Sequence, residues 1–174
     1  VQRADALLDE FNPRGGSGKQ DLSVGMPEGL ARDLLPVLAS QYASKYPLGR
    51  LNIKIGLSAS IEKWIENSEV DVGVLYGFDR GGDPRFIRDV LVTERLCAVA
   101  AADYASNALP GIAQDFEFSR LALHPLVLTS PANGVRRALD RVGQEVGVAI
   151  RSRLEVDSFS MLLDVVRQKR GVTV

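Results

Sequence analysis

The sequence is poor in the residues that build metal sites and disulfide bonds. It contains a single cysteine, Cys97, and a single histidine, His124. One cysteine cannot form an internal disulfide, and one histidine leaves no obvious zinc cluster. We therefore expect neither a metal nor another cofactor, and a cytoplasmic location rather than export. Because Leu96 and Val99 lie close to Cys97, we also expect this thiol to be buried and unreactive.

Long apolar stretches and an excess of basic residues are also absent. The chain is 45% hydrophobic and 25% charged, which is the composition of a soluble globular protein with one or two domains. No run is apolar enough to cross a bilayer or to serve as a secretion signal. Since 21 Lys and Arg are balanced by 22 Asp and Glu, we expect this chain to bind neither nucleic acid nor a membrane.

The sequence offers little for catalysis. His124 precedes a predicted strand, where a surface or packing role is expected. No Gly-x-Ser-x-Gly nucleophile elbow occurs. Glu155 and Asp157 share one face of a predicted strand, but the nearby Arg151 and Arg153 indicate ordinary ion pairs. We therefore expect no enzymatic activity.

The clearest pattern is a strand, a helix and a second strand in direct succession. Residues 51–57 alternate between apolar and polar or small side chains, as a half-buried strand does. Ile61, Trp64 and Ile65 follow at helical spacing. Residues 70–76 are mostly apolar and β-branched, as in a strand covered on both faces. This is a βαβ unit, whose connection is almost always right-handed.

Another strand and helix precede this unit. Residues 22–25 form a short predicted strand, and the helix after it has apolar residues four apart, at Leu30, Leu34, Leu38 and Tyr42. Pro36 lies inside that helix, so we expect a kink or a restart there. The resulting βαβαβ order places the first strand in the middle of the sheet and the 51–57 strand at its edge.

A second α/β set follows. Residues 86–102 predict two strands, with the chain passing from one sheet to another near Glu94. The remaining predicted elements are a strand at 125–129, a helix at 135–146, a strand at 153–156, a helix at 159–169 and a strand beginning at 172–174. Within the first of these helices we expect four residues to face inward: Val135, Leu139, Val142 and Val146. The fold class is therefore α/β.

Several segments, taken in order, carry a family resemblance. Examples are Gly-Met-Pro-Glu-Gly-Leu at 25–30, Asn-Gly-Val-Arg at 133–136 and Glu-Val-Asp-Ser at 155–158. Together they resemble the effector-binding domain of LysR-type transcriptional regulators. The resemblance covers residues 22–174 and implies two doubly wound α/β subdomains with a ligand cleft between them, the type II periplasmic-binding-protein-like fold.

The resemblance also implies a division of the chain. Residues 1–21 correspond to the end of a linker helix and a flexible joint, in which the glycines at 15–18 lack the spacing of a phosphate-binding loop. Residues 22–95 correspond to the first subdomain without its returning C-terminal segment, and residues 96–174 to the second. The winged helix-turn-helix that reads DNA in this family is expected outside this chain.

A ligand of such sheets lies beyond the carboxyl ends of the strands, near the helix N-termini. The positions so placed are Met26, Pro27, Glu28, Gly29, Ser58, Ala59, Ser60, Tyr76 and Gly77 in the first subdomain, and Thr129, Ser130, Asn133, Ser158 and Phe159 in the second. Four of the serine hydroxyls could hold a small carboxylate, or each serine could simply cap its helix. Because Glu28 would repel an anion but attract an amino group, an amino-acid-like effector is the alternative to a simple carboxylate.

The resemblance implies a ligand-sensing regulatory domain that changes the geometry of a dimer or tetramer when its effector binds. It also implies a homodimer in which the helix at 30–46 and the strand at 51–57 face the partner's helix at 135–147 and strand at 153–156. A free-standing solute-binding protein of a transporter would share the cleft and is the alternative.

Overall fold

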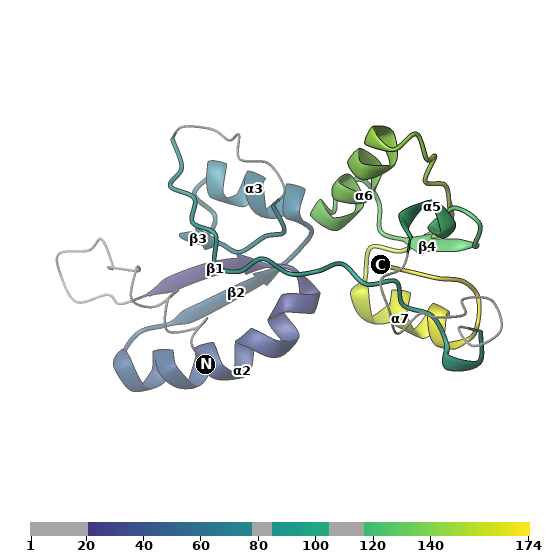
Figure 1. Ribbon diagram of the computed structural model, residues 1–174. Coiled ribbons are helices and arrows are strands. Elements are labelled where there is room, and N and C mark those ends of the chain that lie inside the picture. The colour runs from purple at the N-terminus through teal and green to yellow at the C-terminus, as the bar shows by residue number, and fades with distance from the viewer. Residues whose placement is uncertain (1–20, 78–84, 105–116) are drawn as a thin grey trace. The chain divides into compact units, whose positions relative to one another are not determined.

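The computed structural model of the chain describes residues 21–77, 85–104 and 117–174 (Figure 1). The predicted linker helix and the glycine-rich joint lie outside these residues. The chain divides into two compact units between Thr93 and Glu94. Within the three described ranges, no helix combines the length and the apolar character needed to cross a bilayer.

The first unit is built on a three-stranded parallel sheet. Its strands are β1 (Leu22–Met26), β2 (Leu51–Ile55) and β3 (Val72–Gly73), in the order β2-β1-β3. The prediction that the first strand lies in the middle and the second at the edge is therefore confirmed. Parallel strands need a long connection that crosses from one end of the sheet to the other. Two helices provide these connections: one of 18 residues between β1 and β2, and one of nine residues between β2 and β3.

Helix α2 (Glu28–Lys45) covers one face of this sheet. Its Leu38 and Tyr42 are buried in one cluster with Val24 of β1. The helix is continuous through Pro36, so the predicted restart is wrong. Pro36 is exposed, and water can therefore bind the backbone carbonyl that its missing N–H leaves without a helical partner.

Helix α3 (Ser58–Glu66) packs on the opposite face, where glycines let it approach closely (Figure 1). A Cβ added at Gly56 would lie 2.4 Å from the Trp64 ring. One added at Gly73 would lie 2.3 Å from Ile65 Cδ1. Since contacts below 3 Å cannot be accommodated without movement, these glycines fix how near α3 lies to the strands.

The second unit is built on a parallel pair of strands, β4 (Leu126–Leu128) and β5 (Ser152–Glu155). Val172 continues the sheet beyond β4 through an isolated parallel bridge, and Thr173 forms an antiparallel bridge with Val99. The strand start predicted at 172–174 is thus present only as bridges.

The described part of this unit includes the helices α5 (Phe118–Leu121), α6 (Gly134–Glu145) and α7 (Phe159–Arg167). Leu128 is buried in a cluster with residues of α5 and α6. Val127, the next residue toward the start of β4, is buried with residues of α7 instead. Because successive strand residues point to opposite faces, the two clusters lie on the two sides of the sheet.

The inward face of α6 differs from the prediction. Val142 and Val146 are 37% and 55% exposed, so the stripe predicted to be buried is only partly so. The buried residues are Gly134, Arg136, Ala138, Leu139 and Gly143. The helix turns this side inward because the chain returns against Gly143, where an added Cβ would lie 2.6 Å from the carbonyl oxygen of Val148.

The two strands predicted in residues 86–102 are wrong. In the described part of this segment the only β contact is the isolated bridge of Val99. Val90 is 86% exposed. A β-branched run forms a strand only where another strand satisfies its backbone groups, and none lies beside it among the described residues. Cys97 is accordingly exposed, which corrects the prediction of a buried thiol.

Candidate functional site

The predicted site residues of the first unit gather at the carboxyl edge of its sheet. Met26 ends β1, and Pro27 is the residue immediately before α2; both are buried. The N–H of Gly56 donates to the carbonyl of Met26 at 3.2 Å, which brings the turn after β2 beside the end of β1. Tyr76 follows β3 and is half-buried, and Gly77 is exposed. Glu28 and Gly29 form the first turn of α2, and both are half-buried.

Helices α2 and α3 both begin at this edge without a side-chain cap from their N-cap residues, Pro27 and Leu57. Ser58 is the first residue inside α3 and is fully buried, so it does not cap the helix as the simpler alternative required. Ala59 and Ser60 follow it and are half-buried. The first-turn N–H groups of an α-helix attract anions when no cap residue occupies them.

The predicted site residues of the second unit lie at the carboxyl edge of β4 and β5. Asn133 caps α6, since its Oδ1 accepts a hydrogen bond from the N–H of Val135 at 2.8 Å. Ser158 caps α7, with its Oγ 3.5 Å from the N–H of Met161 and 3.1 Å from the hydroxyl of Ser160. For Ser158 the capping alternative is therefore correct. Phe159 opens α7 and is partly exposed.

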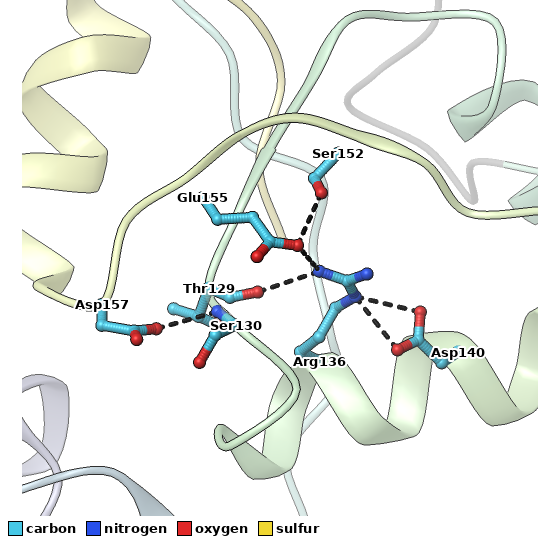
Figure 2. A network of polar contacts seen from close by, with 7 residues as sticks. All are labelled: Thr129, Ser130, Arg136, Asp140, Ser152, Glu155 and Asp157. Atoms are coloured by element: carbon cyan, nitrogen blue, oxygen red, sulfur yellow. Dashed lines mark hydrogen bonds and ion pairs between the residues drawn. The ribbon is translucent and has the colours of Figure 1, made fainter.

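Thr129 and Ser130 are held by residues that the sequence did not single out for a site (Figure 2). The N–H of Ser130 donates to Asp157 Oδ1 at 2.8 Å. Arg136 Nη1 donates to the carbonyl of Thr129 at 3.1 Å. The backbone of Ser130 is therefore fixed by a carboxylate that lies two residues after the end of β5.

Arg136 is the centre of this polar network, as Figure 2 shows. Its Nε donates to both carboxylate oxygens of Asp140 at 3.0 Å, and its Nη1 donates to Glu155 Oε1 at 2.9 Å. Ser152 also donates to Glu155 Oε1, at 2.8 Å. Arg136 is 8% exposed, so its charge is stabilised by two carboxylates rather than by water.

The electrostatics follow from this geometry. The hydrogen bond from Arg136 holds the pKa of Glu155 below its ordinary value, and the hydroxyl of Ser152 acts in the same direction. Burial lowers the pKa of Arg136, but its bonds to Glu155 and Asp140 outweigh burial and raise it. The ion pair of Glu155 is thus with Arg136 across the unit, not with the neighbouring arginines on its own strand, which corrects the sequence-based expectation.

Two residues of this edge, Arg136 and Asp157, were missed as candidates for the site. The sequence did contain a pattern that predicts an ion pair of Arg136, because Arg136 and Asp140 stand four residues apart on one helix face. His124 packs as predicted, with its Nδ1 3.4 Å from the hydroxyl of Tyr104. Among the described residues, no cluster of three or more His, Cys, Asp or Glu could hold a metal ion.

Comparison with known proteins identifies relatives of the whole described chain. Residues 15–174 match the family of the LysR substrate binding domain. The HTH-type transcriptional regulator BbuR of Bordetella bronchiseptica is 27% identical over 155 residues, which are 88% of this chain and 45% of BbuR. This chain thus spans less than half the length of that relative.

Solved structures share the fold. The effector binding domain of QuiR in complex with shikimate has a TM-score of 0.74 at 15% identity, covering 90% of this chain and 73% of that one. The C-terminal domain of a probable LysR family regulator from Rhodococcus sp. RHA1 has a TM-score of 0.73 at 24% identity, with the same coverage. The predicted fold class, α/β of the type II periplasmic-binding-protein kind, is confirmed.

Proposed function

This chain belongs to the family of LysR substrate-binding domains, and we propose that it senses a small-molecule effector for a DNA-binding transcriptional regulator. The observation that carries the proposal is the family match over residues 15–174. The family consists of non-enzymatic regulatory domains, in line with the absence of a catalytic motif in the sequence. BbuR is an HTH-type regulator of which this chain spans 45%, so we place DNA binding in a separate N-terminal domain of the whole protein. The match favours this function over a free-standing solute-binding protein.

We propose that the effector binds between the two units, at the carboxyl edges of their sheets. Two observations support this site. Helices α2 and α3 begin at the carboxyl edge of the first sheet, and their N-cap residues form no side-chain cap. Helices α6 and α7 begin at the carboxyl edge of the second sheet, where Asn133 and Ser158 cap them. Helix N-termini favour negative charge, which suits a carboxylate group. The QuiR domain, which shares the fold, was solved with shikimate, a carboxylate.

The two edges also carry acids, which restricts the class of effector. Glu28 begins α2, and Asp157 lies at the end of β5 beside Ser130. A purely anionic molecule would be repelled by these groups. We therefore propose a small carboxylate that also carries hydroxyl or amino groups, which includes amino-acid-like molecules.

Binding would act through population shift. An effector that contacts both units favours one arrangement of the units over another, to the extent that its affinity for the two arrangements differs. In the assembled regulator this difference would alter the dimer or tetramer that holds the DNA-reading domains. The whole protein would then work in the cytoplasm, where its DNA lies.

We propose that two copies of the chain form a homodimer through the elements that the sequence indicated. Strand β2 is the edge of its sheet, and its Ile55 is 48% exposed. In the second unit, Leu154 of β5 is 43% exposed, and Val142 of α6 and Val146, directly after α6, are also accessible. A dimer that pairs α2 and β2 of one copy with α6 and β5 of the other would remove this apolar surface from water.

A thermal-shift screen tests the effector site. The panel contains shikimate, benzoate, succinate, L-glutamate and L-lysine, which separate aromatic, hydroxylated, dicarboxylic and amino-bearing compounds. We expect one of them to raise the melting temperature of the chain, and the shift to be lost in Ser60→Ala and in Ser130→Ala. Ser60 is chosen because the neighbouring Ser58 is fully buried and its replacement would disturb packing. Ser44→Ala, at an exposed position of α2, is the matched control.

The outcome separates the possibilities. A shift that survives in both Ser60→Ala and Ser130→Ala would refute this placement of the site. A shift that is lost equally in Ser44→Ala would indicate an unspecific effect of the compound.

A further inference from the structure

The loop between β4 and α6, residues 129–133, is held from three sides by charged side chains. Arg136 Nη1 donates to the carbonyl of Thr129, and Arg137 Nη1 donates to the carbonyl of Ala132 at 3.2 Å. Asp157 accepts the N–H of Ser130. Both ends of the loop backbone are thus tied to charged groups, and charge-assisted hydrogen bonds of this kind are stronger than neutral ones.

Arg136 differs from the other two anchors because it joins the loop to the rest of the unit. Its guanidinium contacts α6 through Asp140, β5 through Glu155 and the loop through Thr129. These groups are separated by up to 26 residues in the sequence, and the planar fork of arginine reaches all three at once. A lysine at this position keeps the charge, but its three N–H groups diverge from one nitrogen, whereas Arg136 donates from two separate nitrogens, Nε and Nη1.

We propose that Arg136 is a positioning residue for the effector: it sets the conformation of the 129–133 loop, so that the hydroxyl of Ser130 and the start of α6 are presented in one fixed geometry. The proposal rests on the proposed function, since only an effector at this edge makes that geometry matter for binding. Asp140 and Glu155 do not touch the effector in this scheme; they orient the guanidinium, and the guanidinium orients the loop.

Amide hydrogen exchange on the ligand-free chain tests the positioning directly. In Arg136→Lys we expect the N–H groups of Ser130, Asn133 and Val135 to exchange about tenfold faster or more than in the wild type, because the loop loses a charge-assisted anchor. The N–H of Val127, which donates to Val172 at 2.9 Å inside the sheet, should keep its wild-type rate. Arg167→Lys is the matched control, because its ion pair with Asp164 lies on the exposed face of α7.

The five-compound panel then provides a binding readout. For a compound that stabilises the wild type, Arg136→Lys should weaken its affinity about tenfold while the melting temperature of the ligand-free chain stays within a few degrees of the wild type. Arg167→Lys should bind like the wild type. If Arg136→Lys does not fold, Glu155→Gln serves instead, because it removes one orienting partner and leaves the arginine in place.

Each result decides one question. Unchanged exchange at Ser130 and Asn133 would overturn the positioning role, and so would equal acceleration at Val127, which would mark a general loss of stability. Faster exchange in the loop with unweakened binding would also overturn it. If no compound of the panel binds the wild type, the proposed function loses support, and the exchange rates alone decide whether Arg136 positions the loop.

Discussion

The substitution Gly73→Ala should push helix α3 away from its sheet. Gly73 lies in β3, directly under the helix. An alanine Cβ there would stand 2.3 Å from Ile65 Cδ1 and 2.8 Å from Ile61 Cγ2. Rotation of the terminal methyl group of Ile65 relieves only part of this crowding, because the branched methyl of Ile61 is held by its helical rotamer and by complete burial. The helix itself therefore has to move.

The expected cost follows from two opposing effects. Overpacking of a core by one methyl group destabilises a protein by about 1 to 3 kcal/mol. Replacing glycine in a strand returns roughly 0.5 to 1 kcal/mol, because the unfolded chain is less flexible. The middle of the two ranges leaves a net loss of about 1 kcal/mol, which corresponds to a decrease in melting temperature of roughly 4 to 8 °C for a unit of this size.

The fluorescence of Trp64 provides the assay. It is the only tryptophan of the chain and lies in α3, so its emission reports the unfolding of the first unit. Gly77→Ala is the matched control, because a Cβ at this exposed position would meet only Leu75 Cδ1, at 3.8 Å. In the double variant Gly73→Ala with Ile65→Val, which removes the nearest methyl group, the loss should be smaller than the sum of the single losses.

Equal stability of Gly73→Ala and Gly77→Ala would refute this reasoning. It would mean that α3 does not approach β3 as closely as the contact with Ile65 requires. Additive losses in the double variant would show that the strain lies elsewhere.

Three further predictions concern stability and assembly. Thr173→Val should raise the free energy of unfolding by about 1 kcal/mol in urea titrations, because the hydroxyl of Thr173 is buried with no hydrogen-bond partner among the described residues and valine keeps its shape. Thr93→Val, at an exposed position, should change little. Since Arg136 lowers the pKa of Glu155 in the folded chain, the pair stabilises the fold at neutral pH and ceases to do so as the pH falls through that lowered pKa. The urea midpoint should therefore fall more on acidification in the wild type than in Glu155→Gln, and parallel curves would contradict this. Val146→Asp should shift the chain from dimer to monomer in sedimentation velocity at micromolar concentration, because it places a charge on the proposed interface; a wild type that is already monomeric would contradict the interface.

Local periodicity was sufficient to predict the strand order of the first unit, although the strand predicted at 70–76 is present only as Val72–Gly73. The alternation of residues 51–57 and the helical spacing of Ile61 and Ile65 come from short stretches of sequence, and they led to a correct strand order with β2 at the edge. The placement of the candidate site residues at the carboxyl edges followed from the same pattern, because the direction of each parallel strand determines which residues come after it.

The same reasoning was wrong wherever burial depends on a distant segment. Residues 86–102 have the composition of strands, but whether they pair depends on a neighbouring strand, which the described residues do not provide. The exposure of Cys97 has the same origin. Helical spacing placed Val142 and Val146 in one stripe, but it could not say which stripe the sheet would cover.

By itself the sequence determined the strand order of the first unit, the family resemblance and the sheet edges at which the candidate site residues lie, because each of these depends on neighbours in the chain. Only the tertiary structure decided the partners of charged groups. Arg136 meets Glu155 across 19 residues and Ser130 meets Asp157 across 27, although Arg151 and Arg153 stand nearer to Glu155 in the chain. A buried guanidinium takes the carboxylates that packing brings within reach, and packing brings together segments that local sequence patterns cannot relate.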